Sequence, residues 1–373
     1  MELFSFADRE IFEERHIAIH AAGAEQNVAT RVAVCKGAGS GFELSSASLL
    51  EASWEISPGK SRAGIRILSS DTISTMRHLL PTLLGVFACA SSVFAQTSAD
   101  FAQHIANEYR MIPNVTYLTM GGIDLKLDVY QKRNVNTPQP TLVYMHGGFW
   151  VAGNKETAIL SLLPWMEMGW NVINVEYRLG AVAHAPAALE DCLCSLRFIA
   201  APPQLMAYNI DPQKIVVMGE SAGGHLALSL GIIPESAGLD LECVNGQPLP
   251  KVAAVINWFG VYDVPDVIDG PNKQQAAERW FGSMPDRMEV AKRVSPMMYV
   301  RAGLPPIITI HGDADRTVPY AQAVKLNADL ERLKVPHQLI TIPGGGHGNF
   351  APEQRTLIYR VIREFLTKNG IIN

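Results

Sequence analysis

The feature of this sequence that most constrains its fold is a regular alternation of two kinds of segment, which begins near residue 115. Short runs rich in β-branched residues alternate with longer stretches of helical character. The runs predicted as strands are 124–130, 141–144, 172–176, 215–218, 252–258, 307–310 and 339–342. The stretches predicted as helices are 156–168, 187–200, 222–231, 319–333 and 353–368. This order predicts an α/β fold, with a mostly parallel sheet of about eight strands and helices on both faces.

The strand pattern separates one edge of the sheet from its centre. Residues 124–130 alternate apolar and polar side chains, as an antiparallel edge strand does. The other runs are almost continuously apolar, which is typical of strands buried on both faces. The interval 232–300 is longer and irregular, and we expect part of it to be a small cap insertion that roofs a pocket. Ordinary core is the alternative for its large side chains, which are Trp258, Phe259, Tyr262, Trp280, Phe281, Met284, Met297 and Met298.

The segment 76–95 has the three parts of a secretory signal peptide. It begins Met76-Arg77-His78, continues through a short apolar stretch and ends Val93-Phe94-Ala95. We therefore expect residues 76–95 to be a signal peptide and residues 1–75 to be an upstream extension that is not native, with Met76 as the natural start. The alternative is a buried helix of a real N-terminal domain. The pattern predicts a secreted or periplasmic protein, and a lipoprotein at Cys89 is disfavoured because Phe87 fits a lipobox poorly.

Composition limits the partners and cofactors of the remaining domain, residues 96–373. The chain has 31 basic and 36 acidic residues with no long basic run, which argues against nucleic acid as a partner. No apolar run is long enough for a membrane span. The five cysteines form no CxxC or Cys/His cluster, so no metal site is expected. Any pairing among Cys192, Cys194 and Cys243 stays open, as does the oligomeric state.

The segment Gly219-Glu220-Ser221-Ala222-Gly223 has the form G-x-S-x-G between a predicted strand and a predicted helix. In that context a sharp turn exposes the serine hydroxyl, and side chains two positions on either side would collide. The N-terminal N–H groups of the following helix favour developing negative charge at the site. Ser221 is therefore a candidate nucleophile.

The segment His146-Gly147-Gly148-Phe149-Trp150 follows another predicted strand. Its two glycines leave backbone N–H groups unobstructed, and with the N–H of Ala222 they form a candidate oxyanion hole. We expect His146 to brace this loop rather than to act as a base. The predicted substrate-binding residues are Phe149, Trp150 and Glu220.

Two further strand ends carry a candidate acid and a candidate base. Asp313 and Asp315 follow the strand near 307–310, and His347 lies in a glycine-rich loop after the strand near 339–342. The resulting chain order, serine, then acid, then histidine, is that of α/β-hydrolases. We expect Asp313 to turn the chain by bonding nearby backbone N–H groups, and Asp315 to lie where the loop bends back towards His347.

At these residues the sequence resembles the α/β-hydrolase superfamily, and within it the hormone-sensitive-lipase-like carboxylesterases. Within that group it more closely resembles the bacterial feruloyl-esterase-like branch, BD-FAE, whose pattern H-G-G-x-W-x-x-G-x-K occurs here from His146 to Lys155. The segment from Glu220 to His225 also resembles this branch. The resemblance covers about 115–370 and implies that Asp315 is the acid. Phe149 replaces the third glycine of the commoner loop, so the N–H donors are either Gly147 and Gly148 or Gly148 and Phe149.

The resemblance implies a serine carboxylesterase that acts on short-chain acyl or aryl, feruloyl-like, esters through an acyl-enzyme. Its triad would be Ser221, His347 and Asp315, with no metal or organic cofactor. An amide hydrolase is the alternative, because the loop also resembles that of arylformamidases, and H-G-x-x-D-x-x-V-P occurs in prolyl-oligopeptidase-like peptidases. A non-catalytic binding protein is a third possibility, which the presence of all three triad residues disfavours.

Overall fold

The computed structural model describes residues 100–241, 243 and 248–372. The predicted signal peptide at 76–95 and the predicted extension before it lie outside the described residues. In the described part of the chain the central element is an eight-stranded sheet with the order β1-β2-β4-β3-β5-β6-β7-β8. The strands are β1 (Tyr109–Met120), β2 (Ile123–Lys132), β3 (Gln139–Met145), β4 (Asn171–Val175), β5 (Ile210–Glu220), β6 (Ala254–Trp258), β7 (Ile307–Gly312) and β8 (His337–Ile342).

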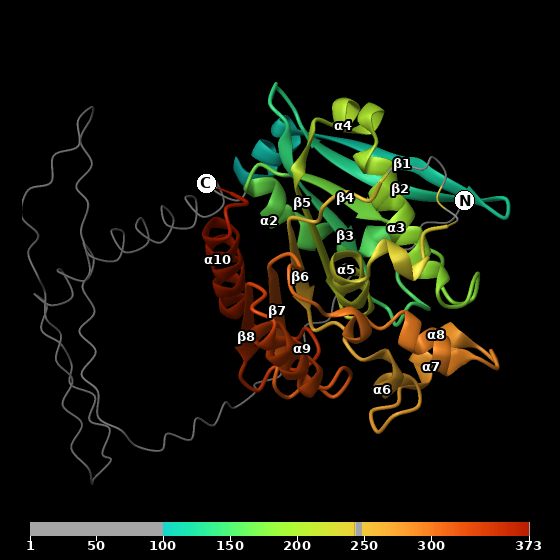
Figure 1. Cartoon of the computed structure of the whole chain (residues 1–373). Coiled ribbons are helices and arrows are strands. Elements are labelled where there is room, and N and C mark those ends of the chain that lie inside the picture. Colours follow the sequence, from blue (N-terminus) through green and yellow to red (C-terminus); the bar gives the residue numbers. More distant parts are fainter. Residues whose placement is uncertain (1–99, 242, 244–247, 373) are drawn as a thin grey trace, which may run out of the picture. The chain divides into compact units, whose positions relative to one another are not determined.

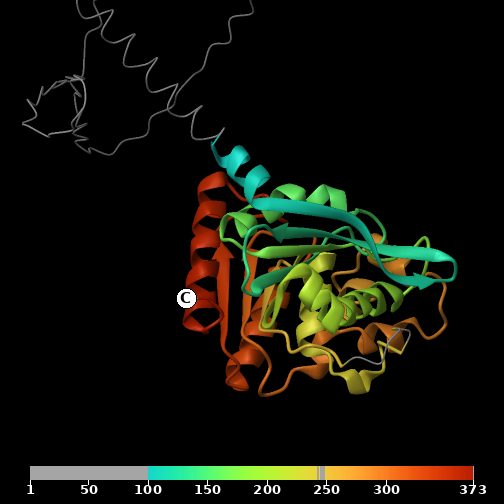
Figure 2. The same ribbon diagram turned by 90° about the horizontal axis from the view of Figure 1, so that it is seen from above.

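Strand pairing follows the predicted division between edge and centre. β1 pairs antiparallel with β2, and β2 pairs antiparallel with β4. Every other neighbouring pair, from β4 and β3 to β7 and β8, is parallel. β1 and β2 form a long hairpin at one edge of the sheet, drawn in teal in Figures 1 and 2. The predicted α/β class, with a mostly parallel sheet of eight strands, is confirmed.

The helices lie on both sides of this sheet, as predicted. The α-helices with both ends inside the described residues are α2 (Ile159–Glu167), α3 (Ala187–Ala200), α4 (Pro202–Tyr208), α5 (Ala222–Ile232), α6 (Val264–Ile268), α7 (Gln275–Phe281), α8 (Arg287–Arg293), α9 (Tyr320–Arg332) and α10 (Pro352–Lys368). The part of the chain that the structure describes also has the short 3₁₀ turns η1 (Lys155–Ala158), η2 (Glu235–Ala237) and η3 (Pro296–Tyr299).

Two hydrophobic cores form because successive strand side chains point to opposite faces of the sheet. Val143 and Met145 of β3 belong to the core that includes α3, α5 and residues of α9. Leu142 and Tyr144 of the same strand belong to the core that includes α2 and α10. Because both faces are covered, the central strands read as continuous apolar runs in the sequence.

The interval 232–300 contains a central strand and several short helices, and its role as a cap stays a prediction. β6 pairs with β5 and β7, and the short helices α6, α7 and α8 follow it (Figure 1). The aromatic residues that the sequence analysis named in this interval are buried in the core, which was the alternative to a role in a cap. Met298, by contrast, is 53% exposed. The buried ones are Trp258, Phe259, Tyr262, Trp280 and Phe281.

A disulfide joins Cys194 of α3 to Cys243. Cys192 is a buried free thiol. The sequence left this pairing open, and the structure closes a loop of 49 residues with it.

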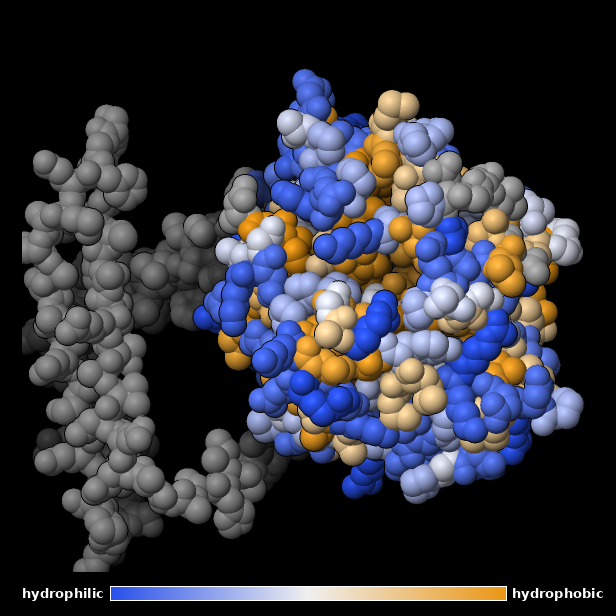
Figure 3. All heavy atoms as spheres, in the orientation of Figure 1, coloured by the Kyte–Doolittle hydropathy of each residue, from blue (hydrophilic) through white to orange (hydrophobic). Residues whose placement is uncertain are grey.

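The surface of the described part mixes polar and apolar side chains, as Figure 3 shows for one face. Among the described residues, no helix has the length and hydropathy that a membrane crossing requires.

Candidate active site

Ser221 lies at the sharp turn between β5 and α5, where the sequence predicted a nucleophile. Its backbone has φ 56° and ψ −118°, a combination that is costly for a residue with a side chain. A Cβ on Gly219 would lie 2.2 Å from the carbonyl oxygen of Gly223, and a Cβ on Gly223 would lie 2.1 Å from that of Met145. Both glycines of the motif are therefore required by close approach of the backbone.

His347 bonds both Ser221 and Asp315. The Nε2 atom of His347 lies 2.8 Å from Oγ of Ser221, and its Nδ1 atom lies 2.7 Å from Oδ2 of Asp315. Ser221 follows β5, Asp315 follows β7 and His347 follows β8. The carboxyl ends of these parallel strands lie at one edge of the sheet. The fold thus brings together side chains that are 126 and 32 residues apart in the sequence.

Asp315 is held by more than His347. Its Oδ1 atom accepts hydrogen bonds from the backbone N–H groups of Thr317 and Val318, at 2.8 and 3.0 Å. Nε2 of His311 lies 3.3 Å from its Oδ2 atom. Burial opposes ionisation of this carboxyl, but the hydrogen bonds from His311 and His347 outweigh burial and lower its pKa. The group is therefore a fixed anion beside the imidazole.

Asp313 has a different role from the one expected from the sequence. Its Oδ1 atom accepts a hydrogen bond of 2.7 Å from the backbone N–H of Gly344, in the loop that carries His347. It therefore ties two loops together across 31 residues, whereas the local turn is made by Asp315. The expectation that Asp313 turns the chain locally is wrong.

The glycine loop after β3 lies against the serine turn. A Cβ on Gly147 would lie 2.9 Å from the carbonyl oxygen of Glu220 and 3.5 Å from Cβ of Ser221. Gly148 has φ +125°, and a Cβ there would lie 2.0 Å from the carbonyl oxygen of Ala152. Ala222 is the first residue of α5, so its N–H has no acceptor within the helix. The glycine loop and the first residue of α5 therefore both lie beside Ser221.

His146 begins this loop and is 2% exposed. Its ring stacks on Tyr177 with a centroid separation of 4.3 Å, and its Nδ1 atom lies 2.7 Å from the carbonyl oxygen of Gly147. Burial lowers its pKa, so the neutral form is favoured. These contacts are those of a bracing residue.

The predicted substrate-binding residues lie in different environments. Trp150 is fully buried and stacks on Trp280 at 4.4 Å, so its side chain is part of the core instead of a pocket wall. Phe149 is half-buried and packs against the same core. Glu220 is half-buried, accepts a 3.3 Å hydrogen bond from Oγ of Ser161, and has its pKa raised by burial.

Sequence reasoning gave no role to His225, which the structure places at the centre of the buried scaffold. Its Nδ1 atom accepts a 3.1 Å hydrogen bond from Nε1 of Trp150, and its Nε2 atom lies 2.8 Å from the carbonyl oxygen of Val294. His225 is fully buried, and burial lowers its pKa to about 4. It links the glycine loop, the helix after Ser221 and the segment before η3. The only sequence feature that could have pointed to His225 was its place in the family-like motif Glu220–His225.

No group of three or more His, Cys, Asp or Glu side chains within the described residues is arranged to hold a metal ion.

Known proteins share both the sequence pattern and the fold. The chain is 29% identical over 238 residues to the esterase LipC of Mycobacterium tuberculosis (strain ATCC 25618 / H37Rv), covering 60% of this chain and 56% of LipC. It is 28% identical over 204 residues to the probable carboxylic ester hydrolase LipM of the same organism, covering 53% of this chain and 46% of LipM. The chain thus spans about half the length of these curated relatives.

Solved structures match over most of the described domain. A truncated carbohydrate esterase from gut microbiota matches with a TM-score of 0.59 and 29% identity, covering 70% of this chain and 98% of that one. Propionate-bound Est2, an esterase of Thermogutta terrifontis, matches with a TM-score of 0.59 and 26% identity, covering 71% and 96%. The BD-FAE family profile matches residues 127–330, which is more than half of the sequence and includes both glycine motifs. This protein therefore has the α/β-hydrolase fold and belongs to the BD-FAE family.

Proposed function

We propose that this protein is a serine carboxylesterase that hydrolyses short-chain acyl or aryl esters through an acyl-enzyme. The observation that carries the proposal is the chain of hydrogen bonds Ser221–His347–Asp315, at 2.8 and 2.7 Å, on a serine held at φ 56°. The curated relatives LipC and LipM are described as an esterase and a probable carboxylic ester hydrolase, which supports the same chemistry.

The proposed first step is attack by Ser221 on the ester carbonyl. Nε2 of His347 accepts the hydroxyl proton as the Oγ–carbon bond forms. Asp315 holds the Nδ1–H tautomer of His347 and stabilises the imidazolium that results. His347 then delivers the proton to the departing alcohol, and water hydrolyses the acyl-serine by the same steps in reverse.

Charge on the carbonyl oxygen is proposed to be stabilised by backbone N–H groups. The N–H of Ala222 at the start of α5 supplies one donor, and the loop Gly147-Gly148 supplies the others. The closeness of Gly147 to Cβ of Ser221 supports this assignment. Phe149 shares the positive-φ conformation of the loop, so Gly148 and Phe149 form the second possible donor pair.

Short acyl groups are the proposed substrates. Est2 of Thermogutta terrifontis was solved with propionate at 26% identity and with butyrate at 25% identity. Feruloyl-like aryl esters are proposed from membership of the BD-FAE family alone.

An amide hydrolase is the second candidate. A 135-residue stretch is 31% identical to human arylacetamide deacetylase-like 2, which covers 35% of this chain. The same triad and oxyanion donors would serve an amide, with His347 protonating the leaving amine.

We further propose that the protein works outside the cytoplasm, in a secreted or periplasmic setting. The signal-like pattern at 76–95 is one support for this. The disulfide between Cys194 and Cys243 is another, because such bonds persist in oxidising compartments.

A substrate panel tests the proposal. The purified full chain is assayed with p-nitrophenyl acetate, butyrate and palmitate, methyl ferulate, N-formylkynurenine and a prolyl anilide. We expect the highest kcat/KM on acetate or butyrate and a steep fall to palmitate. A preference for palmitate would indicate a lipase, and turnover confined to the formamide or the anilide would overturn the esterase proposal in favour of the amide hydrolase.

A further inference from the structure

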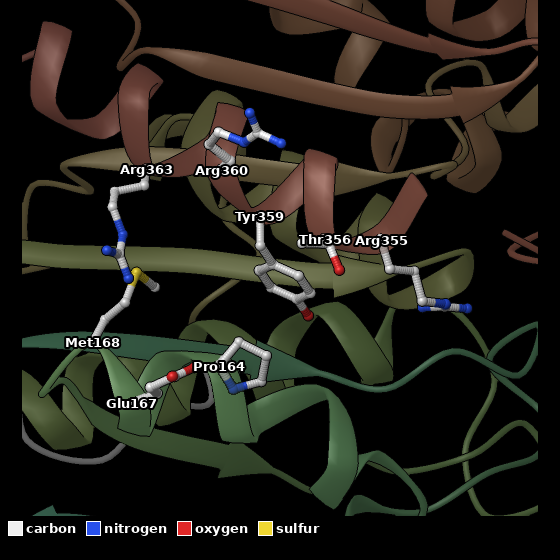
Figure 4. A pocket seen from close by; sticks show the side chains of 8 residues that line it. All are labelled: Pro164, Glu167, Met168, Arg355, Thr356, Tyr359, Arg360 and Arg363. Carbon is white, nitrogen blue, oxygen red and sulfur yellow. The ribbon is translucent and has the colours of Figure 1, made fainter. Parts of the chain in front are cut away.

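A groove separates α2 from α10 on one face of the sheet. The cavity has a volume of about 400 Å³ and is lined by residues at these two helices alone (Figure 4). Its lining residues are Pro164, Glu167, Met168, Arg355, Thr356, Tyr359, Arg360 and Arg363.

The groove is lined by apolar and cationic side chains, and Arg360 is directed away from α2 in Figure 4. Figure 4 shows Tyr359 and Arg363 directed from α10 towards Pro164 and Met168 at α2, with Arg355 at one end. The three arginines, at 355, 360 and 363, are exposed. Glu167 is the one acidic residue among the lining residues.

The arginines of the groove form no close ion pair, although the charge of Arg355 acts on Glu220 from a greater distance and opposes the rise in the pKa of that carboxyl. Within the described part of the chain, no acidic group lies within 4.0 Å of the guanidinium groups of Arg355, Arg360 or Arg363, and Arg355 donates instead to the carbonyl oxygen of Gly348, at 2.7 Å. By contrast, Arg178 and Arg197 of the same domain are each paired with carboxylates. The fork of an arginine suits a carboxylate, so an unpaired row of them favours an anionic ligand.

Hydrogen bonds connect the groove to the segments that carry the proposed catalytic residues. Gly348, which accepts the bond from Arg355, directly follows His347. The hydroxyl of Tyr359 donates to the carbonyl oxygen of Ser161 at 3.3 Å, and Oγ of Ser161 donates to Glu220, the neighbour of Ser221. Arg355 is therefore one hydrogen bond from the residue next to His347, and Tyr359 is two hydrogen bonds from the residue next to Ser221.

We propose that this groove is a substrate-extension subsite that binds the acidic, non-reacting part of an elongated ester, such as an O-acylated oligosaccharide that carries uronate carboxylates. The proposal rests on the proposed esterase function and adds a substrate class to it. The carboxylates bind the arginines of the groove, while the apolar faces of the chain lie against Tyr359 and Pro164.

An extended ligand is favoured over a single anion by the spacing of the cations. Arg355 and Arg363 are eight positions apart on α10, which corresponds to about 12 Å along the helix axis. A second cavity, of about 310 Å³, continues past Arg363 to Trp170 and Ile372. A concave groove of this length suits a chain with repeated charges better than it suits a flat anionic membrane surface.

The test compares an acidic ester with a neutral one of the same acyl group. The substrates are O-acetylated oligogalacturonate and O-acetylated xylo-oligosaccharide, and acetate release gives kcat/KM for each. We compare the ratio of kcat/KM for the acidic ester to kcat/KM for the neutral ester. This ratio is measured in the full chain and in three variants. Arg363→Gln removes a cation of the groove, Glu167→Gln removes the opposing anion, and Lys368→Gln is the matched control on the same helix, outside this groove.

The proposal predicts changes of opposite sign. For Arg363→Gln the ratio falls about threefold, mainly through KM, because an exposed ion pair contributes little more than this. For Glu167→Gln the ratio rises, and for Lys368→Gln it stays within experimental error. The preference for the acidic ester also weakens between low and high salt because exposed charges are screened. Equal ratios in all four proteins, or a fall in Glu167→Gln, would overturn the proposal.

Direct binding separates this inference from the esterase proposal. Calorimetry of the Ser221→Ala chain with deacetylated oligogalacturonate should show binding that Arg363→Gln weakens and Glu167→Gln strengthens. If neither ester is hydrolysed but this pattern appears, the esterase proposal fails and the groove assignment stands. No binding to the oligosaccharide, or binding only to vesicles that contain anionic lipid, would contradict the groove assignment whatever the result of the activity assay.

Discussion

At the scale of single residues, the two aspartates after β7 show how the loop assigns roles to similar side chains. Asp315 accepts bonds from its own turn and from His347, whereas Asp313 accepts a bond from the backbone of Gly344. In a strand continued past β7, both side chains would point to one face, so alternation alone leaves the acid undecided. The backbone turns after Gly312, and the side chains of Asp313 and Asp315 therefore reach different partners.

Replacing Asp315 by asparagine should therefore damage catalysis far more than the same change at Asp313. An asparagine in place of Asp315 would favour the wrong tautomer of His347, and we expect kcat to fall on the order of 10⁴-fold, as in serine proteases. An asparagine in place of Asp313 keeps an acceptor for the N–H of Gly344, so the loss should be small. Steady-state kinetics on p-nitrophenyl acetate, with circular dichroism to check folding, measures both. A larger loss in folded Asp313→Asn would contradict the assignment.

The burial of His225 predicts how the free energy of unfolding depends on pH. Its pKa is about 4 in the folded chain and 6.5 when exposed. Below pH 6.5 the unfolded chain protonates this histidine before the folded chain does, so stability that is fully present above pH 6.5 is lost as the pH falls to about 4. At 1.36 kcal/mol for each unit of pKa shift, the loss amounts to about 3 kcal/mol.

Urea unfolding at several pH values tests this. The free energy of unfolding of the natural chain should fall more steeply between pH 6.5 and 4 than that of His225→Gln, because glutamine can donate and accept without titrating. Parallel pH curves for the two proteins would show that His225 is not buried in its neutral form.

At the scale of elements, the regular parts of the fold could be predicted from the sequence and the irregular parts could not. β1 escaped prediction because its pairing with β2 shifts register between Ile112 and Val115 and again between Thr116 and Leu118. Each shift breaks the period of two on which strand recognition depends. The short helices α6 to α8 have too few residues to establish a helical period.

Local motifs predicted the neighbourhood of the candidate site but not the packing of its side chains. Gly219 and Gly223 could be predicted from steric reasoning because the constraint lies within the motif. Trp150 could not be placed, because its burial depends on stacking with Trp280, which lies 130 residues later. The same holds for the bond between Trp150 and His225.

The glycine loop after β3 has no room for a side chain at Gly148, so a substitution there should reduce kcat. Gly148→Ala places a Cβ 2.0 Å from the carbonyl oxygen of Ala152, so the loop must shift and its N–H donors with it. We expect kcat for p-nitrophenyl acetate to fall by about 10²-fold or more, as for loss of an oxyanion donor. Gly303→Ala is the control, because Gly303 has φ +79° with open space around it. Equal effects of the two changes would mean that backbone strain, not the loop position, is responsible.

At the scale of the whole molecule, the sheet with its two covered faces supplies most of the framework, and one covalent bond adds to it. The disulfide between Cys194 and Cys243 ties α3 to the segment that follows η2. Arg197, on the same helix as Cys194, pairs with Asp240 and Glu235 in that region. Pairing across 49 residues follows no local pattern, which is why the sequence left it open.

Removing this bond should destabilise the domain as a whole. The chain-entropy model gives about 4 kcal/mol for a loop of this length. We expect the double variant Cys194→Ala, Cys243→Ala to unfold at a lower urea concentration than the natural chain. Dithiothreitol should lower the unfolding midpoint of the natural chain but leave that of the variant unchanged. An equal response of both proteins to dithiothreitol would show that the bond is not the source of the effect.

The measurement that tests the central claim most directly is covalent labelling of the nucleophile. The full chain is incubated with paraoxon, and the labelled peptide is mapped by mass spectrometry, with Ser221→Ala as the comparison. We expect one diethylphosphoryl group, located on Ser221, loss of esterase activity in step with labelling, and no label in the variant. A label on another residue, or ester hydrolysis that persists in folded Ser221→Ala, would contradict it.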